Sequence, residues 1–221
     1  MKWLYKLERR FGRYAIPNLM MYITLSMGMV FLLQYFTGYG LSGLLALDRG
    51  AILQGQLWRL ITFLFVPGST GGILGTLLYL YLNYMLGLAL EEYWGSFKFN
   101  LYYLCGILSA YATMALLGFG TNYYLNLTLF LAYAYLNPNR EFLLFFVLPV
   151  KVKYLALVDW LLMLVLFIQG PWAARLGIAL ALLNFFIFFG GDFLRQLRNQ
   201  IGWWKTRRNF RRGNSGNIRY H

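Results

Sequence analysis

Histidine and cysteine are almost missing from this chain, which has one residue of each type among 221, Cys105 and His221. A single cysteine excludes an internal disulfide framework and a cysteine-based metal site. We expect Cys105 to pack between helices, because a buried thiol behaves as a small apolar side chain. The seven acidic residues are scattered along the chain, so no carboxylate cluster for a metal is evident. The sequence therefore predicts no metal and no other cofactor.

Charge is scarce as well. Charged residues make up 12% of the chain and hydrophobic residues 60%, whereas about a quarter of a typical soluble domain is charged and about half is apolar. Too few polar side chains are present to cover a surface that faces water. Several stretches run for roughly 18 residues or more with few charges, the length needed to cross a hydrocarbon core of about 30 Å. The composition predicts an all-α membrane protein with one membrane domain.

Six apolar segments are candidate spans, and the first is too long for a signal peptide, so we expect it to be retained. The predicted spans cover about residues 18–37, 71–90, 100–117, 123–136, 154–169 and 176–189. The second is expected to stop at Glu91 and Glu92. The predicted organisation is an amphipathic interfacial segment at 1–17, a six-helix domain at 18–190 with a long loop 1 at 38–70, and a basic tail at 191–221.

Positive charge is plentiful, with a net charge of +13, and it gathers at the termini and beside the spans. With six spans, all Lys and Arg residues except Arg49, Arg59 and Arg175 fall on the side of the two termini. The positive-inside rule then places both termini in the cytoplasm, and we expect a multi-pass protein of the plasma membrane. This distribution favours anionic lipids as partners of the basic termini and argues against nucleic acid.

Three stretches carry a resemblance to a known family: "GQLWRLITFLF", "LEEYWGSFKFNLYYLCG" and "PNREFLLFFVLPVKVKYLALV". Together they resemble the rhomboid superfamily of six-helix membrane proteins, which includes intramembrane serine proteases and inactive, derlin-like pseudoproteases. The motif residues are Trp58, Arg59, Glu91 and Gly95. The resemblance implies that loop 1 lies sideways in the outer leaflet, with Arg59 bonded to loop backbone or to a polar helix end. The alternative is an arginine that snorkels at the membrane surface.

The resemblance also implies where catalytic groups would be. Active rhomboids have a serine at the start of span four, a histidine on span six, and a His and an Asn on span two that stabilise the oxyanion. The matching positions here are degenerate, with Gly75, Tyr79 and Asn83 on span two and Thr121 and Asn126 on span four. Span four contains no serine, and the one histidine is the last residue. The sequence therefore predicts no catalytic residue and a pseudoprotease that binds transmembrane segments of client proteins.

Two alternatives stay open. The first is an intramembrane serine-type endopeptidase with a non-standard nucleophile, Thr121 or Ser109. The second, a small transporter, is disfavoured because no span is broken in mid-membrane. The sequence does not define the oligomeric state.

Asp159 is an ionisable residue within predicted span five. Because a charge inside a membrane is costly, such a residue is a candidate functional residue. It could contact a client helix. Alternatively, it could lie at the membrane edge, paired with Lys153 or capping a neighbouring helix. Asn126, Gln169 and Asn184 are candidates for hydrogen bonds between helices, and the spacing of Gly71 and Gly75 predicts a close helix approach.

Overall fold

The computed structural model describes residues 2–68, 72–144 and 148–190. The predicted basic tail, His221 and Gly71 lie outside these residues. The chain divides into two compact units, Met1–Asn184 and Phe185–His221. In the second unit the described residues are the end of a helix, where the ring of Phe185 stacks on that of Phe189.

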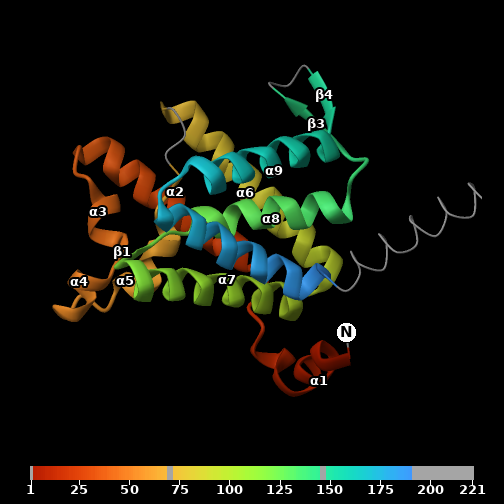
Figure 1. Cartoon of the computed structure of the whole chain (residues 1–221), viewed down its shortest axis with the longest axis horizontal. Helices are drawn as coiled ribbons and strands as arrows, with labels where there is room; N and C mark the ends of the chain where they lie inside the picture. Colours follow the sequence, from red (N-terminus) through yellow and green to blue (C-terminus); the bar gives the residue numbers. More distant parts are fainter. Residues whose placement is uncertain (1, 69–71, 145–147, 191–221) are drawn as a thin grey trace, which may run out of the picture. The chain divides into compact units, whose positions relative to one another are not determined.

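Most of the described residues are helical (Figure 1). The long helices are α2 (Leu19–Thr37), α6 (Gly72–Trp94), α7 (Ser96–Leu117), α8 (Tyr123–Leu136), α9 (Val152–Gln169) and the final described helix, Trp172–Gly190. The shorter elements are α1 (Lys2–Phe11), η1 (Gly12–Tyr14), α3 (Leu41–Leu45), β1 (Leu47–Asp48), α4 (Arg49–Leu53), α5 (Arg59–Thr62), η2 (Phe63–Phe65), β2 (Phe119–Gly120), β3 (Glu141–Leu144) and β4 (Leu148–Lys151).

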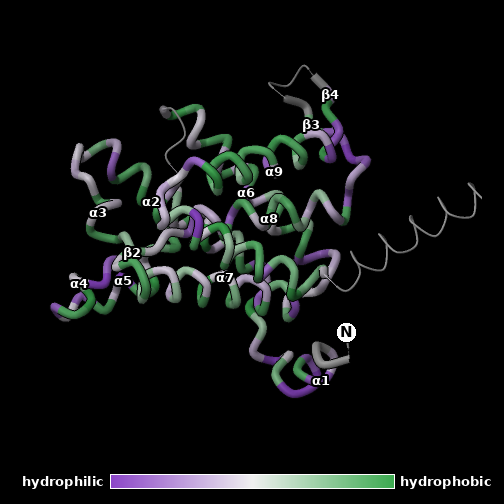
Figure 2. Tube along the Cα trace, in the orientation of Figure 1, coloured by the Kyte–Doolittle hydropathy of each residue, from purple (hydrophilic) through white to green (hydrophobic). Residues whose placement is uncertain are grey.

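Five of the described helices are long and apolar enough to cross a membrane: α2, α6, α7, α9 and the final helix. The chain is therefore a mostly helical, multi-pass membrane protein. Figure 2 shows hydrophobic residues along the labelled long helices and hydrophilic ones gathered at α1, at α4 and before β3. The predicted fourth span is α8, which has 14 residues. At about 1.5 Å per residue it extends about 21 Å, less than a full hydrocarbon core.

Glycine in the left-handed region ends two of these helices. Gly38 follows α2 with a φ of 68° and Gly118 follows α7 with a φ of 89°. Residues with a Cβ rarely adopt this conformation, so glycine is the usual choice after a helix. Helix α6 does not stop at Glu91 and Glu92 as the sequence predicted, but continues to Trp94. The prediction was wrong because Glu91 is buried and bonded, as described below.

The sequence predicted helices alone, whereas the structure adds two short antiparallel ladders. Strand β1 pairs with β2, so Leu47 lies opposite Gly120 in the turn between α7 and α8. Strands β3 and β4 pair antiparallel, with Glu141 opposite Lys151 and Leu144 opposite Leu148. Backbone groups outside helices need partners in an apolar surrounding, and these ladders provide them.

Helix α8 forms the centre of the first unit. It contacts α6, α7 and α9, and Figure 1 shows it running between them. More than half of its residues are buried: Leu125, Asn126, Thr128, Leu129, Leu131, Ala132, Tyr133 and Ala134. Because α8 is buried on several faces, polar groups of the neighbouring helices lie around it. The polar cluster and the cavity described below both include residues of α8.

Helices α2 and α6 form the most extensive helix pair, and Gly87 on α6 sets their distance. A Cβ at Gly87 would overlap the side chain of Met20 on α2. A Cβ at Gly28 on the same pair would meet Leu80 Cδ1 at 3.7 Å, an ordinary contact. Small residues allow the close backbone approach on which helix packing in membranes depends.

We predict that Gly87→Ala lowers the free energy of unfolding by about 1–2 kcal/mol, because overpacking outweighs the gain in helix propensity. The matched change Gly28→Ala is expected to be neutral or slightly stabilising. Unfolding of the two variants in the same detergent measures the difference. Equal stabilities would contradict this account of the α2–α6 contact.

Candidate functional site

Loop 1 is held by Arg59, at the start of α5. The guanidinium Nη1 donates to the carbonyls of Gly43 and Ala46, both at 2.8 Å, and Nε donates to Gln56 Oε1 at 2.7 Å. The expected bond from Arg59 to loop backbone is therefore confirmed. The snorkelling alternative is wrong, because the side chain is 6% exposed. The neighbouring Trp58 is 54% exposed and presents its indole to the surroundings.

Further side chains connect loop 1 to the end of α7 and the start of α8. Asn122 Nδ2 donates to the carbonyls of Leu64 and Val66, at 3.2 and 3.0 Å. The Tyr111 hydroxyl donates to Leu60 O at 2.6 Å. Each bond satisfies a carbonyl of the short helical turns of loop 1 or of the residue that follows them, as an apolar environment requires. The loop is thereby fixed beside the α7–α8 turn.

The other motif residues lie at the opposite end of α7. Glu91 Oε1 accepts hydrogen bonds from the backbone N–H of Asn18 at 2.7 Å and from Ser96 Oγ at 2.6 Å. Gly95 separates α6 from α7 with a φ of 82°, which favours glycine. Glu91 thus connects the starts of α2 and α7 to the end of α6. The structure does not bring Trp58 and Arg59 together with Glu91 and Gly95.

Three of the degenerate active-site positions do meet. Asn126 Nδ2 on α8 donates to the Tyr79 hydroxyl on α6 at 2.7 Å. Asn83 Nδ2 donates to the Tyr79 carbonyl at 2.8 Å, one turn back along α6. A Cβ at Gly68 would be 2.9 Å from Tyr79 Cζ, so the end of loop 1 lies on the tyrosine ring. We call Tyr79, Asn83 and Asn126 the α6–α8 polar cluster.

Several buried polar atoms of the first unit have no hydrogen-bond partner among the described residues. Two of them are Asn126 Oδ1 and the hydroxyl of Tyr103 on α7. Gly75 is half-buried one turn before Tyr79 on α6. The remaining position, Thr121, does not join the cluster.

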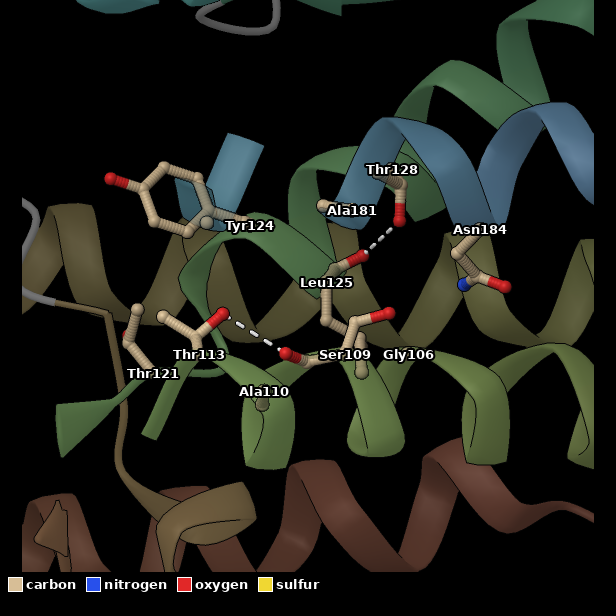
Figure 3. A pocket seen from close by; sticks show the side chains of 11 residues that line it. Gly106, Ser109, Ala110, Thr113, Thr121, Tyr124, Leu125, Thr128, Ala181 and Asn184 are labelled. Atoms are coloured by element: carbon tan, nitrogen blue, oxygen red, sulfur yellow. Dashed lines mark hydrogen bonds between the residues drawn. The ribbon is translucent and has the colours of Figure 1, made fainter. Parts of the chain in front are cut away.

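Thr121 lines a separate cavity between α7, α8 and the final helix (Figure 3). About 20 Å³ of it is open to the centre of a water molecule, which is room for one water. Its polar lining residues are Ser109, Thr113, Thr121, Tyr124, Thr128 and Asn184. Gly106 and Gly177 allow the helices to approach, since a Cβ there would meet the side chains of Leu125 and Tyr124 at 2.5 and 2.6 Å.

The serine and threonine hydroxyls of this cavity are already engaged. Ser109 Oγ donates to the carbonyl of Cys105 at 3.0 Å or that of Leu180 at 3.3 Å. Thr113 donates to Ser109 O at 2.9 Å and Thr128 to Leu125 O at 2.7 Å, as the dashed lines in Figure 3 show.

Thr121 Oγ1 accepts from the N–H of Tyr123 at 3.1 Å. No lining residue has an imidazole, amine or carboxylate. The cavity can therefore hydrogen-bond a small polar group, but it contains no side chain that would remove a proton from a hydroxyl at neutral pH.

Asp159 is buried in α9, with 8% of its surface exposed. The predicted ion pair with Lys153 is not formed. The Lys153 ammonium lies instead 5.1 Å from the centre of the Tyr154 ring. Within the described part of the chain, the one ion pair joins Lys98 to Glu8, and Asp159 Oδ2 has no hydrogen-bond partner. An unpaired charge in a span costs about 2.5–3.5 kcal/mol on the scale from insertion experiments.

Comparison of the chain with family models, with curated proteins and with solved structures gives no match. Among the described residues, no three His, Cys, Asp or Glu side chains gather as a metal site would require. Sequence reasoning missed Asn122 and Tyr111, although Asn122 directly precedes the apolar run of α8, where a polar residue often contacts backbone.

We predict that Arg59→Ala lowers the free energy of unfolding by about 3 kcal/mol, because the carbonyls of Gly43 and Ala46 lose their donor and the buried side chain leaves a cavity. Arg49 is exposed and donates to Ala115 O at 3.2 Å, so Arg49→Ala is expected to change stability by less than about 0.5 kcal/mol. Thermal unfolding of both variants in detergent tests this. Similar losses would show that Arg59 does not hold the loop.

A double-mutant cycle tests the α6–α8 polar cluster. We expect Tyr79→Phe and Asn126→Ala to be coupled by about 0.5–1.5 kcal/mol, as for hydrogen bonds between membrane helices. Tyr111→Phe, which breaks a bond to loop 1 and none to Asn126, is the matched control and is expected to be additive with Asn126→Ala. Additivity in the first cycle would mean that the bond between Tyr79 and Asn126 contributes nothing.

Proposed function

We propose that the chain is a rhomboid-like pseudoprotease of the plasma membrane, which binds transmembrane segments of other membrane proteins without cutting them. The observation that carries this proposal is the cavity at the start of α8. It lies where the resemblance to the rhomboid superfamily implies a nucleophile, and it is lined by hydroxyls and an amide with no proton acceptor beside them.

Nucleophilic catalysis needs a hydroxyl whose proton can be removed by an adjacent base. Ser109, Thr113 and Thr128 donate their protons to main-chain carbonyls of their own helices or of a neighbour. A carbonyl oxygen is a weak base and does not take up a proton at neutral pH. These bonds support a role of the hydroxyls in holding helices together.

Client binding is supported by the outer faces of α6 and α9. Residues 164–168 of α9 are all exposed, and the first half of α6 exposes Ile73, Leu74, Leu77, Leu78 and Tyr81. These faces are apolar and suit either lipid or another helix. The 14-residue α8 adds a second argument, since a short span thins the bilayer around it and attracts helices that fit poorly elsewhere.

In this proposal α8 also crosses the membrane, as the fourth of six spans, and both termini are cytoplasmic. Helix α1 is placed beside the start of α7 by the ion pair of Lys98 with Glu8, at 3.4 Å, and by the Lys98 ammonium over the Tyr5 ring. Its basic residues, with Arg9 and Arg10 in the last turn, are then available to anionic lipid headgroups on the cytoplasmic face.

A second candidate function is an intramembrane hydrolase with a non-standard nucleophile. It is favoured by one observation, that Ser109 and Thr121 line the same cavity. Its difficulty is the lack of a base among the lining residues.

We predict that a photo-crosslinking residue at Ile168, on the exposed end of α9, captures single-span membrane proteins of unshortened mass in native membranes. Leu25 on α2 is equally exposed, at 65% against 62%, and is the matched control position, where we expect lipid adducts instead. Mass spectrometry of the adducts gives the result. Equal capture at both positions, or capture of lipid alone, would contradict client binding at α9.

The hydrolase reading has its own test. We expect the purified chain not to be labelled by a serine-reactive fluorophosphonate, because no hydroxyl of the cavity is activated. Labelling that disappears in Ser109→Ala or Thr121→Ala would overturn the pseudoprotease proposal and support the hydrolase. Gly43→Ala, at a loop position where a Cβ meets nothing within 4 Å, is a control for general effects of substitution.

A further inference from the structure

Helix α9 packs against the rest of its unit through only a few buried side chains. Val152, Asp159 and Met163 are its buried residues, and it packs mainly on α8 and also contacts β4. From Leu164 to Gln169 every side chain is exposed. Among the candidate spans α9 buries the smallest share of its residues. A helix held so lightly can accept a second helix along most of its length.

One of the three buried residues is the acid Asp159, seven residues after the start of α9. At about 1.5 Å per residue this is about 10 Å into the helix, a third of the way across the hydrocarbon. The carboxyl has no ion pair or hydrogen bond with any residue of the described segments. An apolar residue would pack better here, so the acid is poorly explained by the stability of this chain alone.

A cation at the same depth would satisfy this carboxyl. Lys151 and Lys153 flank the start of α9 and are exposed, and Lys153 lies over Tyr154. The described spans of a second copy offer no free cation at this depth, since α2, α6 and α8 contain neither Lys nor Arg. In α7 and the final helix, the basic residues are near the first turn and engaged, Lys98 with Glu8 and Arg175 with Ile168 O.

We propose that Asp159 recognises client transmembrane helices that carry a Lys or Arg within the cytoplasmic third of the bilayer. This inference rests on the proposed function and specifies its client class. The client helix lies along the exposed face of α9, and its long basic side chain reaches between α9 and α8 to the carboxylate. In a medium of low dielectric constant the two charges satisfy each other, and each helix is relieved of an unpaired charge.

The probes are single-span reporters with a 20-residue Leu/Ala helix. One carries a Lys at the seventh position from the cytoplasmic end, one carries Leu there, and one carries the Lys at the seventh position from the other end. Each is co-expressed with the full chain, which bears the photo-crosslinker at Ile168. We expect the first reporter to crosslink about tenfold more than the other two.

Asp159→Asn is expected to abolish this preference while leaving the chain at least as stable in thermal unfolding. Glu141→Gln removes an exposed acid near the same end of α9 and is expected to leave the preference intact. Asp159→Lys with a reporter carrying Asp at the seventh position is expected to restore crosslinking, which a merely structural role of Asp159 would not do.

The outcomes separate the two proposals. If all reporters crosslink equally, and Asp159→Asn changes nothing, the chain binds helices but Asp159 does not select them, and the inference is overturned. If no reporter crosslinks above the level seen with the photo-crosslinker at Leu25, client binding itself fails. Crosslinking of the chain to a second copy, in place of the reporter, would also overturn the inference.

Discussion

The structure depends on the rule that no main-chain carbonyl can remain without a donor away from water. Loop 1 breaks into short helical turns and so leaves carbonyls that no long helix satisfies. Arg59 supplies donors to two of them from a single buried guanidinium, and Asn122 supplies two more. Because Asn122 directly precedes α8, the same bonds that satisfy the loop also fix where the central helix begins.

The polar interior follows from the position of α8. On one side its Asn126 bonds to Tyr79 of α6, and on the other its first turns form the cavity with α7 and the final helix. Both sites contain amides and hydroxyls, which are neutral and form hydrogen bonds at modest cost in a membrane. The buried charges Arg59 and Glu91 are held by hydrogen bonds to loop 1 and to neighbouring helix ends. Asp159, a buried acid without a hydrogen bond or ion pair among the described residues, lies instead on the candidate span with the least burial.

The sequence predicted much of the fold because apolar length and charge distribution act locally along the chain. The long helices, the bond from Arg59 to loop backbone, and a hydrogen bond of Asn126 to another helix were expected, whereas its partner Tyr79 was not predicted. The end of α6 was missed because Glu91 is satisfied by Asn18, 73 residues away, which no local pattern reveals. The β1–β2 pair and the β3–β4 pair were missed because each ladder is only a few residues long. The rhomboid resemblance, the six-span topology and the orientation stay predictions.

The most direct test of the central claim reconstitutes the purified full chain with a fluorescently labelled single-span protein in one bilayer, and measures energy transfer and intact mass together. We predict energy transfer that saturates as the chain is added, while the mass of the single-span protein stays unchanged. Fragments produced by cleavage of a peptide bond within the bilayer, and lost when Ser109 or Thr121 is changed to alanine, would contradict the account.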